Sequence, residues 1–197
     1  MEELKFKQDK RSVRTRKLIK LALLKLVRNK DIDHISITEL TALAGINRNS
    51  FYTHYTSICN VLDDINMDIV ELIDSIIKKY TYAEFRAEPY PLLRDFSTAI
   101  TENKYFTEYL LFSRSSGDLT AKLKEMLCDR FYQIYLSERP STSPFAKYML
   151  AFLVGGVFDV YYVWFRNDKD LPLDDITKKT ADFLKRGLVV MHDLNED

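Results

Sequence analysis

A run of four polar residues, from Asn47 to Ser50, stands directly before the aromatic pair Phe51 and Tyr52. Its arginine, Arg48, can donate two parallel hydrogen bonds to the edge of a guanine, and asparagine or serine side chains can reach bases or phosphate. At the first turn of a helix, free backbone N–H groups would add donors for a phosphate oxygen. This stretch therefore suits contact with nucleic acid, while a packing corner between two helices is an alternative explanation of its aromatic residues.

The residues before this run predict a capped helix that stops at a glycine. Ser36 and Glu39 have the spacing of a capping box, and Ile35 and Leu40 are placed as its hydrophobic staple. We expect the helix to end just before Gly45, because glycine suits the left-handed conformation that commonly follows a helix.

A long amphipathic helix is predicted further upstream, between about Asp9 and Asn29. Its apolar residues recur at helical spacing and are Ile19, Ala22, Leu23, Leu26 and Val27. With Asn47 as the N-cap of a third, short helix, the three helices and the tight glycine turn predict a helix-turn-helix. This arrangement would direct Ile46 and Phe51 into the core and the first turn of the third helix toward a major groove.

Tyr52 and His54 fall on other faces of the third helix, where they could contact a DNA backbone. Aromatic residues on a short helix more often pack in a core, and a lone histidine is more often a surface residue. The residue types alone therefore do not show whether Tyr52 and His54 contact DNA. The combination of a capped helix, a glycine turn, a polar first turn and a basic helix upstream favours the DNA-contact interpretation.

The net charge of the chain is zero but is unevenly distributed. Residues 1–60 contain twelve Lys and Arg and six Asp and Glu, a net charge of +6, and the remaining residues carry −6. A basic first third beside an acidic remainder is typical of a polyanion-binding module joined to a domain with another task. A solvated basic face would have the same composition, so charge alone supports either interpretation.

Residues 12–65, which contain ISITELTALAGINRNSFYTHY, resemble the N-terminal DNA-binding domain of the TetR family of bacterial transcriptional regulators. The resemblance covers the first amphipathic helix, ISITELTALAGI as the second helix and NRNSFYTHY as the recognition helix. It implies base contacts from Arg48, Asn49 and Ser50. It also implies backbone contacts from Ser36, Thr38, Tyr52 and His54.

One position departs from this pattern. Many TetR relatives have a lysine that contacts phosphate at the start of the fourth helix, and the matching residue here is Ile58. We expect basic residues of the first helix to supply that contact instead, namely Lys10, Arg11, Arg14 and Lys17. The implied partner is a double-stranded DNA operator. A homodimer is expected to bind it, because two recognition helices must lie about 34–36 Å apart, or at a related spacing, to read a palindrome.

Helical periodicity continues over the rest of the chain, without the sustained alternation that is typical of strands. We expect an all-α fold with about nine helices in total. Residues 1–56 would form the helix-turn-helix domain, and residues 57–197 a helical bundle for ligand binding and dimerisation. The helical segments predicted after the third helix are 57–80, 91–102, 104–113, 118–137, 144–167 and 173–193.

Residues 61–197 contain 21 of the 25 aromatic residues. Most aromatics at helical spacing pack in a core, but the TetR resemblance implies a ligand cavity, and aromatic walls suit a small amphipathic or aromatic effector. The candidate ligand-binding residues are Tyr105, Tyr109, Phe112, Phe131, Tyr135, Asp159 and Tyr162. Asp159 is included because it is a charge within an apolar segment, and a pair across an interface would explain it equally well.

Two adjacent glycines lie inside the apolar segment 144–167. Each costs about 1 kcal/mol relative to alanine, so we expect another helix to approach closely, in the same chain or in a second subunit. A kink that lines a cavity is the less common alternative. Residues 151–188 also resemble a TetR subgroup that includes the activator of a dihydroxyacetone kinase operon. The predicted dimer interface comprises Gly155, Gly156, Val160, Trp164 and Phe183.

Catalysis is not expected, because the three histidines are scattered and no glycine-rich phosphate loop is present. We expect no cofactor and no metal. Cys59 and Cys128 lack metal-site spacing and are expected to be reduced thiols. A buried, inert thiol is the favoured expectation at Cys59, and a redox role is the alternative.

The N-terminus lacks an apolar signal segment, and no early apolar run is long enough to span a membrane, so we expect a cytoplasmic protein. An alternative function is that of a DNA-binding regulator without a small-molecule ligand, whose C-terminal domain binds a protein partner.

Overall fold

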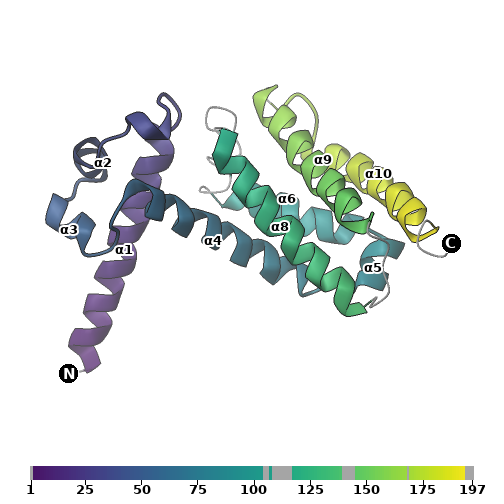
Figure 1. Cartoon of the computed structure of the whole chain (residues 1–197), viewed down its shortest axis with the longest axis horizontal. Helices are drawn as coiled ribbons and strands as arrows, with labels where there is room; N and C mark the ends of the chain where they lie inside the picture. Colours follow the sequence, from purple (N-terminus) through teal and green to yellow (C-terminus); the bar gives the residue numbers. More distant parts are fainter. Residues whose placement is uncertain (1, 104–106, 108–116, 139–144, 168, 194–197) are drawn as a thin grey trace. The chain divides into compact units, whose positions relative to one another are not determined.

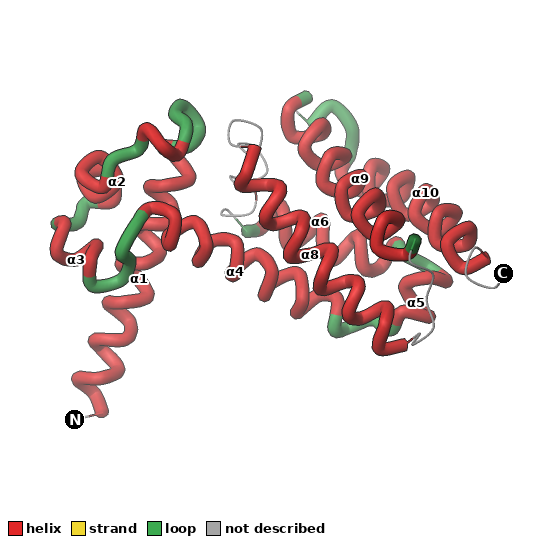
Figure 2. The backbone as a smooth tube through the Cα atoms, viewed as in Figure 1, coloured by secondary structure: helices red, strands yellow, loops and turns green. Residues whose placement is uncertain are grey.

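The computed structural model describes residues 2–103, 107, 117–138, 145–167 and 169–193. Within these residues the chain forms nine α-helices and one short 3-10 helix, with no strand (Figure 2). This confirms the predicted all-α fold. The chain divides into two compact units. Met1–Asp68 form the first, and most of the described residues from Ile69 onward form the second.

The first unit contains four helical elements and the start of a fifth (Figure 1). They are α1 (Glu2–Leu26), η1 (Ile32–His34), α2 (Ile37–Ala44), α3 (Arg48–Tyr52) and the beginning of α4 (Ile58–Ile77). Helix α1 starts earlier than predicted, because its first residues are mostly glutamate, leucine and lysine, which favour a helix without contributing to the apolar stripe.

Apolar residues from these helices make the core of the first unit. Ile19 and Leu23 of α1, Leu40 of α2, Phe51 of α3 and Val61 of α4 are all fully buried. Burying large apolar side chains from four helices fixes their packing, since each contributes about 1.5–3 kcal/mol. The short α3 is therefore held by Phe51 rather than by its own length, which is too small for an independent helix.

The second unit contains the remainder of α4 and five further helices. They are α5 (Tyr82–Ala87), α6 (Tyr90–Glu102), α8 (Gly117–Glu138), α9 (Ala146–Arg166) and α10 (Leu173–Asp193). Helix α10 packs on α5, α6 and α9. The segment predicted as a helix over 104–113 lies almost wholly outside the described residues.

Helix α5 was not predicted, although a local signal for it is present. The Thr81 hydroxyl accepts a hydrogen bond from the backbone N–H of Glu84, and the Glu84 carboxylate accepts one from the backbone N–H of Thr81. This is a complete capping box. From the sequence, only a break at Pro89 and Pro91 is predicted in this region.

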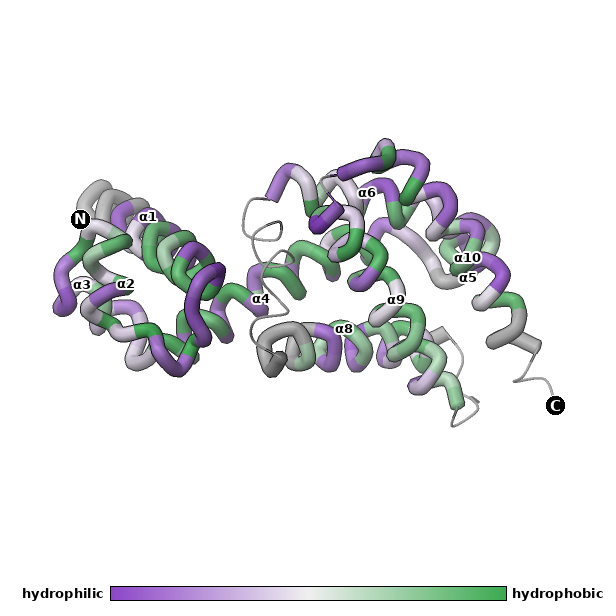
Figure 3. The backbone as a smooth tube through the Cα atoms, turned by 90° about the horizontal axis from the view of Figure 1, so that it is seen from above, coloured by the Kyte–Doolittle hydropathy of each residue, from purple (hydrophilic) through white to green (hydrophobic). Residues whose placement is uncertain are grey.

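Helix α9 is the most apolar helix of the second unit (Figure 3). It is the one described helix that is long and apolar enough, by length and composition, to cross a membrane. A core helix meets the same criteria, and α9 buries eight residues, from Ala146 to Phe165. The hydroxyl of Tyr161 on α9 also forms a buried hydrogen-bonded group with Ser97 of α6, which in turn lies 2.8 Å from the hydroxyl of Thr177 on α10. These contacts are those of a helix packed inside its own bundle.

Candidate functional site

The turn between α2 and α3 is built around Gly45. This residue has φ 67° and ψ 34°, the left-handed conformation, and its backbone N–H donates to the carbonyl of Ala42. The next N–H, that of Ile46, donates to the carbonyl of Thr41 at 3.0 Å. These two bonds satisfy carbonyls at the end of α2 and reverse the chain within two residues. The turn predicted from the glycine is therefore present.

Helix α3 then starts at a side-chain cap. The Asn47 side-chain oxygen accepts a hydrogen bond from the backbone N–H of Ser50 at 2.7 Å. Arg48 and Asn49 are exposed in the first turn, and Ser50 is half-buried. The cap leaves these side chains pointing away from the core at the end of the helix where backbone N–H groups are free.

The aromatic residues of α3 divide between core and surface as predicted. Phe51 is fully buried, whereas Tyr52 is 50% exposed and His54 is partly exposed. The Tyr52 hydroxyl accepts a weak hydrogen bond from the Arg48 guanidinium at 3.4 Å. A packing role therefore fits Phe51 but leaves Tyr52 without a core to fill.

The start of α2 provides two further exposed polar residues, Ser36 and Thr38. The Ser36 hydroxyl accepts from the backbone N–H of Glu39 at 3.2 Å and so caps α2. The Glu39 carboxylate accepts from Lys30 at 2.8 Å, and this ion pair ties it to the end of α1. Thr38 carries a hydroxyl on the same exposed first turn.

The basic residues of α1 that were predicted to contact DNA lie between residues 10 and 17. Arg11, Arg14 and Lys17 are exposed on α1, and Lys10 lies within the helix, one turn before Arg14. They are spaced so that several share one side of the helix.

At the start of α4, Ile58 is half-buried and the neighbouring Cys59 is exposed. The expectation of a buried thiol at Cys59 is wrong, because the first turn of α4 places this side chain outside the apolar stripe. Cys128 is partly buried, and burial raises the pKa of its thiol.

A charged network that sequence reasoning missed joins α1 to α4. Lys20 is only 6% exposed, and its ammonium lies 2.8 Å from Asp64 and 2.5 Å from Asp68. Arg16 pairs with Asp64 at 2.5 Å, and the Tyr55 hydroxyl donates to the same carboxylate. A signal was available, because Lys20 has the helical spacing of the buried residues of α1 and would otherwise be an unpaired buried charge.

The network alters the acidity of its members. Burial acts to raise the pKa of Asp64, but hydrogen bonds from Arg16, Lys20 and Tyr55 outweigh it and lower this pKa to about 2. Burial, together with the hydrogen bond to Asp64, raises the pKa of Tyr55. The carboxylate therefore stays ionised at neutral pH and holds α1, α4 and the residue just after α3 together.

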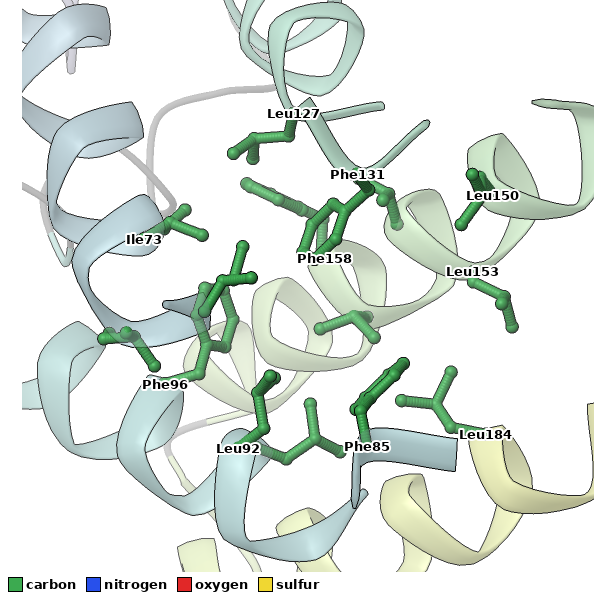
Figure 4. Close-up of a pocket in the computed structure, with 15 residues that line it drawn as sticks. Ile73, Phe85, Leu92, Phe96, Leu127, Phe131, Leu150, Leu153, Phe158 and Leu184 are labelled. Atoms are coloured by element: carbon green, nitrogen blue, oxygen red, sulfur yellow. The ribbon is translucent and has the colours of Figure 1, made fainter. Parts of the chain in front are cut away.

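The second unit contains an apolar cavity of about 70 Å³ (Figure 4). All fifteen described lining residues are hydrophobic, and they come from α4, α5, α6, α8, α9 and α10. Phe131 of α8 and Phe158 of α9 line it, as do Ile73 of α4 and Leu92 of α6. Because this lining offers no polar side chain, a ligand group inside the cavity would find no hydrogen-bonding side chain.

The predicted ligand residues do not all meet at this cavity. Phe131 lines it. Tyr135 does not, but it is buried in a core cluster with Leu150, against which Phe131 also packs, and the Tyr162 hydroxyl accepts from Arg166. Asp159 is exposed and pairs with Lys124 of α8 at 3.2 Å. Three other predicted residues lie outside the described residues, and these are Tyr105, Tyr109 and Phe112.

A second hollow, a groove of about 630 Å³, runs between α9 and α10. The predicted interface residues Gly156, Val160 and Phe183 line it, and Phe183 is 84% exposed. Phe152 of α9 lines it as well and is 72% exposed. Aromatic side chains this exposed on one face are unusual for a surface that meets only water.

The remaining predicted interface residues lie differently. Trp164 is buried, and its indole N–H donates to the carbonyl of Leu171 at 2.7 Å, so it closes the turn after α9. A Cβ placed on Gly155 or Gly156 would meet no atom within 4 Å. Of the two expected forms of close approach, the one within the same chain is therefore not found among the described residues.

A TetR family model described as a transcriptional regulator C-terminal region matches residues 87–186. No curated protein sequence matches the chain.

Two solved structures share the fold. One is a TetR transcriptional regulator from Streptococcus agalactiae 2603V, with a TM-score of 0.60 and 18% identity, covering 94% of this chain and 98% of that one. The other is NalD, the secondary repressor of the MexAB-OprM multidrug efflux pump in Pseudomonas aeruginosa. It has a TM-score of 0.60 and 18% identity, covering 89% of this chain and 96% of NalD.

TetR-type regulators are transcription factors rather than enzymes, which supports the expectation that this chain does not catalyse a reaction. The dihydroxyacetone kinase activator subgroup does not emerge from these comparisons. The family model spans just over half of the chain, and the all-helical fold of both solved structures is the fold found here. The chain therefore belongs to the TetR family of transcriptional regulators.

Proposed function

We propose that this regulator binds a palindromic DNA operator as a homodimer, and that a small molecule in its C-terminal unit changes the affinity for that operator. One observation is the main support for the proposed DNA binding. Arg48 and Asn49 are exposed in the first turn of α3, directly after the left-handed turn at Gly45. This is the end of a recognition helix that meets base edges in a helix-turn-helix.

In this proposal Arg48, Asn49 and Ser50 contact bases, and other exposed groups contact the phosphate backbone. The backbone contacts come from Ser36, Thr38, Tyr52, His54, Lys10 and Arg14. Residues 1–56 act as the DNA-binding domain and residues 57–197 as the ligand-binding and dimerisation domain. Since operator DNA lies in the cytoplasm, we also assign the protein to that compartment.

The groove between α9 and α10 supports the homodimer part of the proposal. Phe152 and Phe183 are large apolar side chains with most of their surface in water, and Gly156 has no side chain to keep a second helix away. Two copies that pair these faces would cover both aromatics, a self-complementary contact of the kind that two-fold symmetry requires. The same pairing would bring two recognition helices to one palindrome.

The effector acts by population shift in this proposal. A ligand that binds one arrangement of the dimer better than another changes the fraction of molecules competent for the operator. Helix α4 contributes Ile73, Ile76 and Ile77 to the cavity, and its first part belongs to the DNA-binding unit. It is therefore the element through which cavity occupancy could reach α3.

A mobility-shift titration with the DNA upstream of the protein's own gene tests the proposal, with sedimentation of the free protein alongside. We expect a dimer at micromolar concentration and a specific complex that salt weakens steeply. A protein that sediments only as a monomer, or that binds unrelated DNA equally well, would refute it. A specific complex that responds to no small molecule but to a second protein would favour the alternative regulator.

A further inference from the structure

The first part of α1 extends beyond the core of its own unit. Helix α1 has 25 residues, but the first buried side chain among those described, from Arg11 onward, is Ile19. We call residues 2–18 the basic segment. At a rise of 1.5 Å per residue it is about 25 Å long. Figure 1 shows its first turns projecting past α2 and α3, so the core of the first unit does not require its full length.

The charge of this segment is positive and is only partly compensated. Residues 2–18 contain seven Lys and Arg and three Asp and Glu, and residues 10–18 contain no acid. Arg16 pairs with Asp64 of α4. Arg11 and Arg14 are exposed, and no ion pair joins either of them to an acid among the residues that the structure describes. At about 100° per residue, they lie on the side of the helix away from Arg16, so the uncompensated charge faces solvent.

These exposed charges are unfavourable without a partner. Lys7, Arg11 and Arg14 are spaced four and three residues apart, which puts neighbouring positions on one face of the helix. Like charges at this spacing destabilise a helix, and a helix of this length without tertiary packing is marginal in water. A polyanion bound along this face would remove the repulsion and release its own counterions.

The composition of the segment suits duplex DNA better than a lipid surface. A helix that lies on a membrane needs a continuous apolar face. The apolar residues within 11–18 are Val13 and Leu18, which are about 140° apart around the helix and form no such face. A DNA duplex presents a phosphate charge about every 1.7 Å along its axis, which is a linear array that a straight basic helix can follow.

The segment begins next to the proposed recognition helix. The Arg16 guanidinium donates to the Tyr55 hydroxyl at 3.4 Å, and Tyr55 lies three residues after the end of α3. From Arg16 toward the N-terminus, the helix runs through Arg14 and Arg11 and past α3 (Figure 1). Since α3 is proposed to enter a major groove, the segment that continues past it would meet DNA beyond the base pairs that α3 reads.

We propose that the basic segment is a second DNA-binding element, which contacts the phosphate backbone flanking the half-site read by α3. This inference rests on the proposed DNA binding and specifies where the contacts of α1 fall, namely outside the operator core. Arg11 and Arg14 make these contacts. The contacts carry no sequence information, because phosphates are common to all sequences, and they lengthen the DNA bound by each subunit.

Mobility shifts of the full-length protein on two duplexes test the inference. Both contain the same operator core, and one adds about ten base pairs at each end, which is about 34 Å and exceeds the segment. We expect the flanked duplex to bind about tenfold more tightly at low salt, by the same factor for two unrelated flanking sequences. Its affinity should also fall more steeply with salt, by about 0.9 in the logarithmic slope for each phosphate contacted.

A duplex of flanking sequence alone corrects for non-specific sites. After this correction, equal affinity for the core and the flanked duplex would overturn the inference. A protein that shows no dependence on the flanks but binds phosphatidylglycerol vesicles would also overturn it, because the segment would then be a membrane-binding element.

Matched variants test which residues are responsible. The double change Arg11→Gln with Arg14→Gln should abolish the gain from the flanks, and changing both to lysine should keep it, since a phosphate contact needs only the charge. Changing both to glutamate should make the flanked duplex the weaker ligand. Lys25→Gln is the control, because Lys25 is exposed on the same face but at the packed end of α1. A gain that survives the glutamine changes would overturn the assignment, and circular dichroism checks that each variant folds.

The failure of this inference can be told apart from the failure of the proposed function. Specific binding to the operator core without any dependence on the flanks would refute the second element and leave the regulator intact. Equal binding to operator and scrambled cores would refute the proposed function, and the inference with it. Arg48→Ala should lose discrimination between the two cores and keep the gain from the flanks, whereas the glutamine changes at Arg11 and Arg14 should do the opposite.

Discussion

The unit formed by Met1–Asp68 presents its candidate contacts from α1, from the start of α2 and from the short α3 with the residues just after it, whereas the unit beginning at Ile69 assembles its cavity from six helices. In the first, the exposed residues Arg48 and Asn49 are neighbours in sequence, and a single turn at Gly45 positions them. In the second, residues as distant as Ile73 and Leu184 line one space. In the proposed function, DNA contact by the first unit therefore depends on individual polar side chains, and ligand binding by the second on how apolar side chains pack.

The two units also differ in the polar groups that they bury. The first places Lys20 in its core and compensates it with Asp64 and Asp68. The second buries neutral hydroxyls instead, those of Ser97, Tyr161 and Thr177, which satisfy one another. The stability of the first unit should accordingly depend on pH in the acid range, while these hydroxyl contacts carry no charge that acid could remove.

The largest effect is expected at the groove of the second unit. Phe183→Asp should weaken self-association by about 2–4 kcal/mol, because it places an unpaired charge where a buried aromatic would anchor the dimer. Sedimentation equilibrium would measure this, and operator binding should fall with it. Since Phe183 is 84% exposed, the monomer should keep its thermal stability. Unchanged self-association would mean that this face does not form the dimer.

The next effect concerns the polar end of α3. Arg48→Ala should weaken specific operator binding by about 1–3 kcal/mol and relax selectivity at the contacted base. Mobility shifts against operator and scrambled DNA would measure both quantities. Arg28→Ala, which removes the same charge from the turn after α1, should lower binding to both DNAs only slightly. An Arg48→Ala protein with full affinity and selectivity would contradict the recognition role.

A smaller effect tests the buried charge network. The pKa of Asp64 is about 2 in the folded chain, below the ordinary value of 3.8, so its contribution to stability is present above about pH 4 and is lost as pH falls toward 2. Asp64→Asn should cost about 1–2 kcal/mol at neutral pH, allowing for solvent screening of a partly accessible group.

Urea unfolding at a series of pH values would measure this loss. The difference between Asp64→Asn and the unaltered protein should shrink as pH falls below about 4, because protonation removes the same charge from the latter. Asp31→Asn is the matched control, since Asp31 is exposed and its side chain makes no capping bond. A difference that stays constant down to pH 2 would contradict the role assigned to the ionised carboxylate.

The smallest expected effect is at the turn. Gly45→Ala should destabilise the first unit by about 1 kcal/mol, because an L-residue is disfavoured at φ 67°. A Cβ there would meet no atom within 4 Å, so the cost is one of backbone conformation rather than of crowding. Thermal unfolding would measure it, with Gly156→Ala, in ordinary helical conformation, as a control that should stabilise the free monomer slightly. Equal effects of the two changes would argue against a strained turn.

Local patterns in the sequence were sufficient to predict the helix caps and the turn of the first unit. Ser36, Gly45 and Asn47 act on backbone groups within a few residues, so a cap or a left-handed turn can be predicted without knowing the rest of the chain. The same kind of signal, Thr81 with Glu84, is present at the start of α5, although this helix was not predicted. The compensation of Lys20 could not be predicted residue by residue, because its partners lie more than 40 positions away.

The sequence by itself determined the helical character of the chain, the helix-turn-helix and its polar first turn, because helix periodicity, caps and glycine turns act over short distances. Only the tertiary structure decided which aromatics line a cavity and which face the solvent. Phe131 lines the cavity, Tyr135 is buried in the core cluster against which Phe131 packs, and Phe183 is exposed on α10. All three have apolar rings at helical spacing, and what separates them is the packing of other helices against each face, which depends on contacts far apart in sequence.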